Sequence, residues 1–432
     1  MHRAAIIAAL LCLSLPSLHA QQADGSELIR HIREADRAYR QKDYAAYLEN
    51  LEKASRVAPG HPSLKFGLAR ANALLGRKRE ALDWLDKLAE TGIFFDIARH
   101  DDLKSLRGEE EFASLVKRFD KTKTPAGNSS VAFALPEKDL IPESVAYDPV
   151  KDAFYVGSIY KRKIVVRDKS GATSDFTTTA RDGLGGVLGI KIDPKRRLLW
   201  ANACNLGADM PMIGPDEATV GQTAVFKYDL DSGRLIKKYA AGSKTEPHCF
   251  NDLVINSEGD VFITVGPPVA AVFMIDHRKD ELETFYRSEN LFPNGLALSE
   301  DDKTLFVTNH IVGVMSIDVK TRRAFILPSP DNITLIGIDG LYVYKNSLVA
   351  VQNGLSLPRI MQYFLSKEMD RVTGGRVLEI NNPRFDIPTT GVVVGDEFYY
   401  VANSQLRAFN PDGTIFPSER LREPVILKTK LN

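Results

Sequence analysis

FPNGLALSEDDKTLFVTN, residues 292–309, is the stretch whose layout the rest of the chain repeats. A polar residue, Asn294, opens a short run of alternating apolar residues, and a polar turn separates this run from a second apolar run at 304–308. Two such runs joined by a polar turn predict a β-hairpin. We therefore expect the chain after residue 130 to be built from copies of this hairpin.

Five other segments repeat this layout, each with an opening residue, a first apolar run and a second apolar run. The copies recur about every 45 residues, except for one longer interval that contains a Pro- and Gly-rich insertion at 205–222. Two further apolar runs follow in most units, and four strands per unit of about 45 residues are typical of a β-propeller blade. The sequence thus predicts an all-β six-bladed β-propeller over residues 131–432. The six openers are Glu143, Leu188, Asn251, Asn294, Asp339 and Thr390.

The openers define a candidate site. If each one begins the innermost strand of its blade, all six stand at one height around the central channel. Four of them, Glu143, Asn251, Asn294 and Asp339, carry carboxylate or amide oxygens, which are the ligands that a hard divalent cation takes. A second interpretation stays open: Asn-Gly and Asp-Gly are strong turn dipeptides, so these positions could be nothing more than tight entries into strands.

The N-terminal residues 1–20 have a basic start and an apolar run, followed by a small residue, Ala20. This pattern predicts a secretory signal peptide, and hence a secreted or periplasmic protein. The apolar run at 4–15 is shorter than the roughly 20 residues that a membrane-spanning helix needs. No membrane span is therefore expected after cleavage.

Residues 26–119 are predicted to be helical because apolar residues recur at spacings of three and four. Two of the helical segments are copies, with Tyr47 and Ala81 at equivalent places, and the offset is the tetratricopeptide (TPR) period of about 34 residues. A TPR-like helical domain would offer a concave groove to a protein partner. Residues 120–130 lack apolar periodicity and are rich in turn formers, so they are the predicted linker. The fold class is thus a multidomain α and β chain.

The charge balance and the cysteine content each support a further inference. The 56 basic residues balance the 56 acidic ones, so no basic surface points to nucleic acid as a partner. Cys204 and Cys249 could form a disulfide in an oxidising compartment, or they could be two buried free thiols. Residues 131–136 and the C-terminal segment both read as strands, and pairing a terminal strand into the last blade would close the propeller.

Four phrases carry a resemblance to a known family: PESVAYD, FNDLVINSEGDVFIT, PNGLALSEDDKTLFVT and IDGLYVYKNSLVAV. From about Leu135 to the C-terminus the chain resembles the SMP-30/gluconolactonase/luciferin-regenerating-enzyme family of six-bladed propellers. The resemblance implies a divalent metal ion at the channel mouth, held by Glu143, Asn294 and Asp339. It implies that Asn251 contacts substrate or metal, and that Asp339 is the general base.

The chain also departs from the pattern of this family. Sugar-lactonase members carry an Arg two residues before the Asn of the FND phrase, where this chain has Cys249. This difference argues against specificity for aldonolactones. The related paraoxonases use a His at the opener of blade two and another after its second strand, whereas this chain has Leu188 and approximately Ala203. A paraoxonase-type His pair is therefore not expected.

These residues suit the hydrolysis of a small-molecule lactone or ester. A cation held by carboxylate and amide oxygens polarises a carbonyl that develops negative charge. Ca²⁺ is the first expectation, with Zn²⁺, Mn²⁺ or Mg²⁺ as alternatives. Either Asp339 or a metal-activated water would supply the base. The other predicted substrate-binding residues are Asn251, His248, Asn309 and His310, and for each His a plain loop role is the alternative. A non-catalytic metal-binding scaffold for protein interactions is the competing function.

Overall fold

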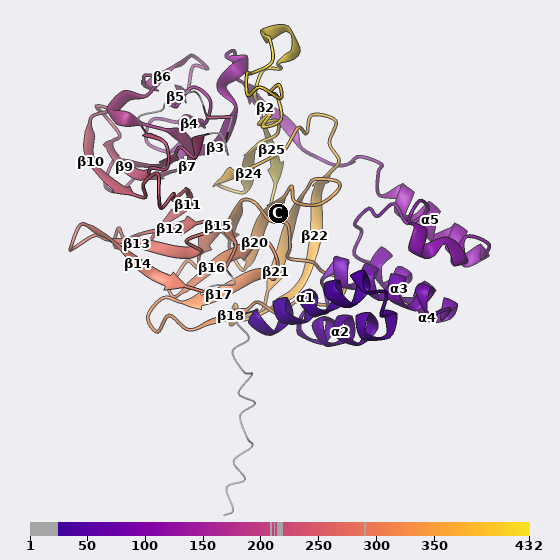
Figure 1. The fold of residues 1–432 in the computed structure, drawn as a ribbon. Coiled ribbons are helices and arrows are strands. Elements are labelled where there is room, and N and C mark those ends of the chain that lie inside the picture. Colours follow the sequence, from indigo (N-terminus) through magenta and orange to yellow (C-terminus); the bar gives the residue numbers. More distant parts are fainter. Residues whose placement is uncertain (1–24, 208–209, 211, 214–218, 289–290) are drawn as a thin grey trace, which may run out of the picture.

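The computed structural model describes residues 25–207, 210, 212–213, 219–288 and 291–432. The predicted signal peptide and part of the 205–222 insertion lie outside these residues. A group of helices packs beside a disc of strands (Figure 1). Within the described ranges, no helix is both long and apolar enough to cross a membrane.

The N-terminal region is helical, as predicted. Its elements are α1 (Ser26–Arg40), α2 (Tyr44–Val57), α3 (Pro62–Leu74), α4 (Lys78–Ala89), a 3₁₀ helix (Asp101–Leu106) and α5 (Glu110–Lys121). Local signals set their ends. The Asp43 side chain accepts a hydrogen bond from the Ala46 amide (3.0 Å) and caps α2, and Pro62 occupies the first position of α3. Gly76 adopts positive φ (76°) just after α3. The TPR-like character of these helices stays a prediction.

The strands form six antiparallel sheets, which confirms the predicted six-bladed propeller. Each of the first five blades runs from an inner strand to an outer one through strands that are consecutive in the chain (Figure 1). The blades are β3–β6 (Pro142–Asp148, Ala153–Ser158, Lys163–Arg167, Thr173–Thr177), β7–β10 (Gly186–Asp193, Leu198–Cys204, Thr223–Asp229, Leu235–Ala241), β11–β14 (Phe250–Ile255, Val261–Val265, Ala271–Asp276, Glu281–Arg287), β15–β18 (Pro293–Leu298, Thr304–Asn309, Gly313–Asp318, Ala324–Ile326), β19–β22 (Leu341–Tyr344, Ser347–Gln352, Arg359–Leu365, Val372–Ile380) and β23–β25 (Gly391–Val394, Glu397–Val401, Val425–Lys430).

Terminal segments close the ring of blades, as expected. Strand β2 (Ser130–Ala134) pairs with β25, so the last blade takes its outer strand from the start of the propeller sequence. This pairing removes a free edge from the sheet. Part of the predicted linker also pairs: β1 (Ala126–Gly127) adds a short fifth strand next to β22.

The helices pack directly on the fourth blade. Leu28 of α1 and Leu51 of α2 are buried in the same apolar cluster as Leu305 and Val312 of that blade. Polar contacts extend the interface to blade five, where Arg359 Nη1 donates to the Thr91 carbonyl (3.2 Å). Burial of apolar surface therefore joins the two regions.

Candidate functional site

The six inner strands line the central channel. Each inner strand contacts the inner strand of the next blade, from β3 to β7 and onward round to β23 and back to β3. Glu143, Asn251 and Asn294 are each the second residue of their strand, and Leu188 is the third residue of β7. Asp339 lies two residues before the start of β19, and Thr390 immediately precedes β23. The openers thus lie at equivalent places around one end of the channel.

A break in strand pairing marks the opener in four successive blades. The register between first and second strands shifts just after Pro142, Val187, Phe250 and Pro293. A β-bulge leaves an extra residue out of the ladder and changes the direction of its side chain. The repeated bulge explains how polar openers can turn into the channel while the residues that follow them stay in the sheet.

The glycines that follow openers are required by close packing and not by turns. None of Gly189, Gly295 and Gly340 has positive φ. A Cβ atom on Gly295 would lie 2.1 Å from the Asp339 carbonyl oxygen, and one on Gly189 would lie 2.7 Å from the Asn251 carbonyl oxygen. The Gly295 amide donates to the Asp339 carbonyl across the blade boundary (2.8 Å). Close packing therefore accounts for these glycines, because the missing side chain lets neighbouring blades approach.

Three carboxylates come together in the channel. Glu143, Asp252 and Asp339 are 7, 2 and 6 % exposed. Burial raises the pKa of Asp339 to about 7, and the charge of Asp252 adds to this, while hydrogen bonds from Asn353 and Asn294 oppose it. Burial, and then the charges of Asp339 and Asp252, raise the pKa of Glu143 well above its usual value. When no cation is near, the charges of Asp252 and Asp339 thus oppose the ionisation of Glu143, and the charge of Asp252 opposes that of Asp339.

Two amide side chains hydrogen-bond the Asp339 carboxylate. The Asn353 side chain donates to Asp339 Oδ2 and also to the Pro388 carbonyl (2.9 Å), which fixes the amide between blades five and six. The Asn294 side chain hydrogen-bonds Asp339 from blade four. The bond of Asn353 to Asp339 is a finding of the structure.

Asp252 is the member of the acidic cluster that sequence reasoning missed. It follows Asn251 directly, and strict strand alternation would place the two side chains on opposite faces. The register shift between Phe250 and Leu253 lifts this constraint. Asp252 Oδ1 accepts from the Leu253 amide (2.8 Å) and lies 3.4 Å from Lys191 Nζ. The signal that could have found it is an acidic residue directly after the opener, in a strand whose remaining residues are apolar.

The acidic cluster fits a hard divalent cation. Among the described residues, Glu143 Oε2 and Asp252 Oδ2 are buried and have no hydrogen-bond partner. An unpaired buried carboxylate oxygen is costly, and oxygen-rich donor sets of this kind suit Ca²⁺ or Mg²⁺. Glu143, Asn294 and Asp339 would hold the ion, with Asn251 at the adjacent opener.

The other predicted binding residues have mixed surroundings. Asn251 is half-buried, and its carbonyl accepts from Asn202 Nδ2 (3.3 Å). Asn309 is buried, and its Oδ1 accepts from the Ile311 amide (3.1 Å), so it shapes the turn after β16. His310 is exposed next to it. His248 is half-buried, and burial lowers its pKa.

The rim beside Leu188 is apolar. Cys204 and Cys249 form a disulfide, so the structure supports the first of the two alternatives for these residues. The bridge joins blades two and three next to the acidic cluster. It belongs to an apolar cluster with Ile159, Leu188, Ile213, Met210, Met212 and Leu406. Among the described residues, this apolar cluster offers few groups that could bind hydroxyls.

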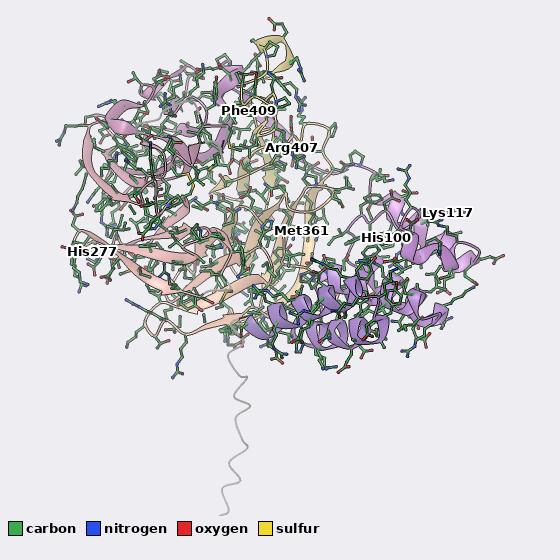
Figure 2. All side chains as sticks on the ribbon, in the orientation of Figure 1. His100, Lys117, His277, Met361, Arg407 and Phe409 are labelled. Atoms are coloured by element: carbon green, nitrogen blue, oxygen red, sulfur yellow. A yellow bond between two sulfur atoms is a disulfide. The ribbon has the colours of Figure 1, made fainter. Side chains whose placement is uncertain are left out.

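Two other features lie away from the channel. Glu258, Asp260 and His277 could together hold a metal ion, yet His277 Nδ1 already hydrogen-bonds Asp260 (2.6 Å). Figure 2 shows His277 at the outer edge of the molecule. A cavity of about 700 Å³ lies between the helices and blade four, where residues such as Val57 and Leu335 make it mainly apolar. We place the site at the channel because the buried acids are there.

Comparisons with known proteins support the fold. No known protein family matches the sequence, and no curated protein matches it. Among solved structures, the allergen Mala s 1 of Malassezia sympodialis is 14 % identical, with 68 % of this chain and 96 % of that chain covered, at a TM-score of 0.50. A gluconolactonase of Xanthomonas campestris is 13 % identical (67 and 86 % covered, TM-score 0.45), and virginiamycin B lyase of Staphylococcus aureus is 12 % identical (68 and 82 %, 0.45). At such identities the likeness concerns the fold alone, and the site must carry the functional argument.

Proposed function

We propose that this protein is a metal-dependent hydrolase of a small lactone or ester. The observation that carries the proposal is the convergence of Glu143, Asp252 and Asp339, all buried, with Glu143 Oε2 left without a partner among the described residues. A structural role alone does not call for three acids in one buried place, because the charges of the neighbouring acids raise the cost of ionising Glu143 and Asp339. A divalent cation bound among the three acids would compensate the cost of ionising them.

The cation would supply the polarisation of a substrate carbonyl and stabilise the negative charge that develops on its oxygen. The chain supplies the remaining functions. Asp339 is held in place by Asn353 and Asn294, and its carboxylate is the candidate base that accepts a proton from water. Burial of the acids excludes bulk water and strengthens the interactions of their charges.

The apolar rim supports a substrate with an apolar group. Leu188, the disulfide and the adjacent methionines can pack on an alkyl or aryl substituent, whereas a polyhydroxylated sugar lactone needs hydrogen-bonding partners. We therefore place alkyl lactones and aryl esters ahead of aldonolactones. Ca²⁺ is the first candidate ion, followed by Mn²⁺, Mg²⁺ and Zn²⁺.

A screen of chelator-treated protein with alkyl lactones, aryl esters and gluconolactone tests this function. Hydrolysis that requires added metal ion, and that favours the apolar substrates, is the expected result. The competing proposal is a non-catalytic scaffold, whose TPR-like helices would bind a protein partner. Metal binding without turnover of any substrate would favour the scaffold. Export to the periplasm or cell exterior is part of the proposal, and the disulfide agrees with an oxidising compartment.

A further inference from the structure

A lysine reaches the acidic cluster from within the channel. Lys191 belongs to β7, the inner strand of blade two, and its Nζ lies 3.4 Å from Asp252 Oδ1 of blade three. The same Nζ lies 5.2 Å from the centre of the Tyr342 ring, which comes from blade five. The lysine side chain is 19 % exposed and that of Asp252 is 3 % exposed. The ammonium group is therefore held between residues of three blades.

The surroundings of this lysine are fixed by backbone contacts. The Asp252 carboxylate accepts from the Leu253 amide, and the Tyr342 hydroxyl accepts from the Gly391 amide of blade six (2.6 Å). The ring face of Tyr342 attracts a cation. Both neighbours of the ammonium group are thus pre-positioned, and the lysine has little freedom to leave Asp252 unpaired.

The charge count of the cluster gives this arrangement a function. Three carboxylates carry three negative charges when ionised, and one lysine reduces the total to two, which matches a single divalent cation. We propose that Lys191 is a built-in counter-ion that neutralises Asp252, keeps this carboxylate away from the bound cation, and leaves Glu143 and Asp339 to balance the ion. This inference rests on the proposed cation site and assigns a role to a residue outside the ring of openers.

The proposal makes Asp252 dispensable once Lys191 is absent. Asp252→Asn alone leaves the lysine as an unpaired positive charge beside the cation, so Ca²⁺ binding should weaken by about ten-fold or more. Lys191→Met in the same chain removes that charge, and the double variant should bind Ca²⁺ within about three-fold of wild type. Lys191→Met alone should bind no more weakly than wild type.

Calorimetric titration with Ca²⁺ provides the test. The proteins are chelator-treated, full-length wild type, Asp252→Asn, Lys191→Met and the double variant. Asp280→Asn is the control, because Lys227 Nζ of β9 lies at the same 3.4 Å from Asp280 Oδ1, in the turn between β13 and β14, and its Ca²⁺ affinity should equal that of wild type. A double variant that binds as weakly as Asp252→Asn overturns the proposal, since Asp252 would then contact the ion itself. Weaker binding by Lys191→Met overturns it as well.

A second measurement separates this inference from the proposed function. In chelator, Lys191→Met should raise the urea midpoint of Asp252→Asn, because the double variant no longer buries an unpaired charge. If no variant binds Ca²⁺, the cation site fails, yet this rescue still supports the counter-ion pair. If the double variant unfolds at a lower urea concentration than Asp252→Asn in chelator, the pair itself is refuted.

Discussion

Asp339 shows how one residue can combine several requirements of the site. It is 6 % exposed, two asparagine side chains hydrogen-bond it, and two other acids lie near. Its raised pKa has a consequence for stability when no cation is present. Between pH 4 and about 7, the folded state binds more protons at this site than the unfolded state does, so the contribution of Asp339 to the free energy of unfolding falls as pH rises through about 7.

Asp339→Asn removes this titration. In chelator, the variant should gain stability relative to wild type as pH rises from 5 to 7.5, by at least about 2 °C in Tm. Thermal melts of both proteins over this pH range measure the difference. A Tm difference that does not change with pH would show that Asp339 ionises freely in the folded protein.

At the scale of single elements, the inner strands depend on bulges and on glycines that allow close approach. Gly295 is the clearest case, because a Cβ atom there would lie 2.1 Å from the backbone oxygen of Asp339. Gly295→Ala must therefore move β15 away from the start of β19, and this movement also displaces Asp339. Overpacking of this kind costs about 1–3 kcal/mol.

Gly295→Ala should lower the free energy of unfolding by at least about 1 kcal/mol and weaken Ca²⁺ binding at the same time. Gly266→Ala is the matched control, because a Cβ atom there would have no neighbour within 4 Å and its φ is not positive. Urea unfolding and calorimetry of the two variants give both quantities. Equal behaviour of the two variants would contradict the close-packing role of Gly295.

The same elements show how far sequence reasoning reaches. The number of blades, the closing strand and the common position of the openers follow from hydrophobic repeats, because those repeats encode burial directly. Asp252 and Lys191 could not be found in this way. A bulge overrides strand alternation at Asp252, and the pairing of Lys191 with it depends on how neighbouring blades are rotated around the channel. A two-residue sequence pattern such as Asn-Gly also fails to distinguish a turn from a close approach of two strands.

At the scale of the whole molecule, the helical domain is attached to the propeller through a buried surface. His61 lies in this contact, where it precedes α3 and hydrogen-bonds the backbone of Ile311. Burial lowers its pKa to about 4. Below pH 6.5 the unfolded state therefore binds a proton at His61 that the folded state does not. The free energy of unfolding decreases for this reason as pH falls from 6.5 to about 4.

His61→Gln keeps a donor for the Ile311 carbonyl but does not titrate. Between pH 6.5 and pH 5, wild type should lose about 2 kcal/mol of stability relative to this variant. Urea unfolding at the two pH values measures the loss, and proteolysis near residues 120–125 shows whether the helices separate first. Parallel pH dependence of the two proteins would mean that His61 becomes protonated within the folded contact.

The most direct test of the account is a calorimetric Ca²⁺ titration of Asp339→Asn beside Asp260→Asn. Both substitutions replace a carboxylate by its amide, but Asp339 belongs to the channel cluster and Asp260 to the separate group with His277 at the outer edge. Asp339→Asn removes one of the charges that face the ion, so this variant should bind Ca²⁺ about ten-fold or more weakly than wild type. Asp260→Asn should bind as wild type does. Unchanged affinity in Asp339→Asn, or loss of binding in Asp260→Asn, would contradict a cation site at the propeller channel.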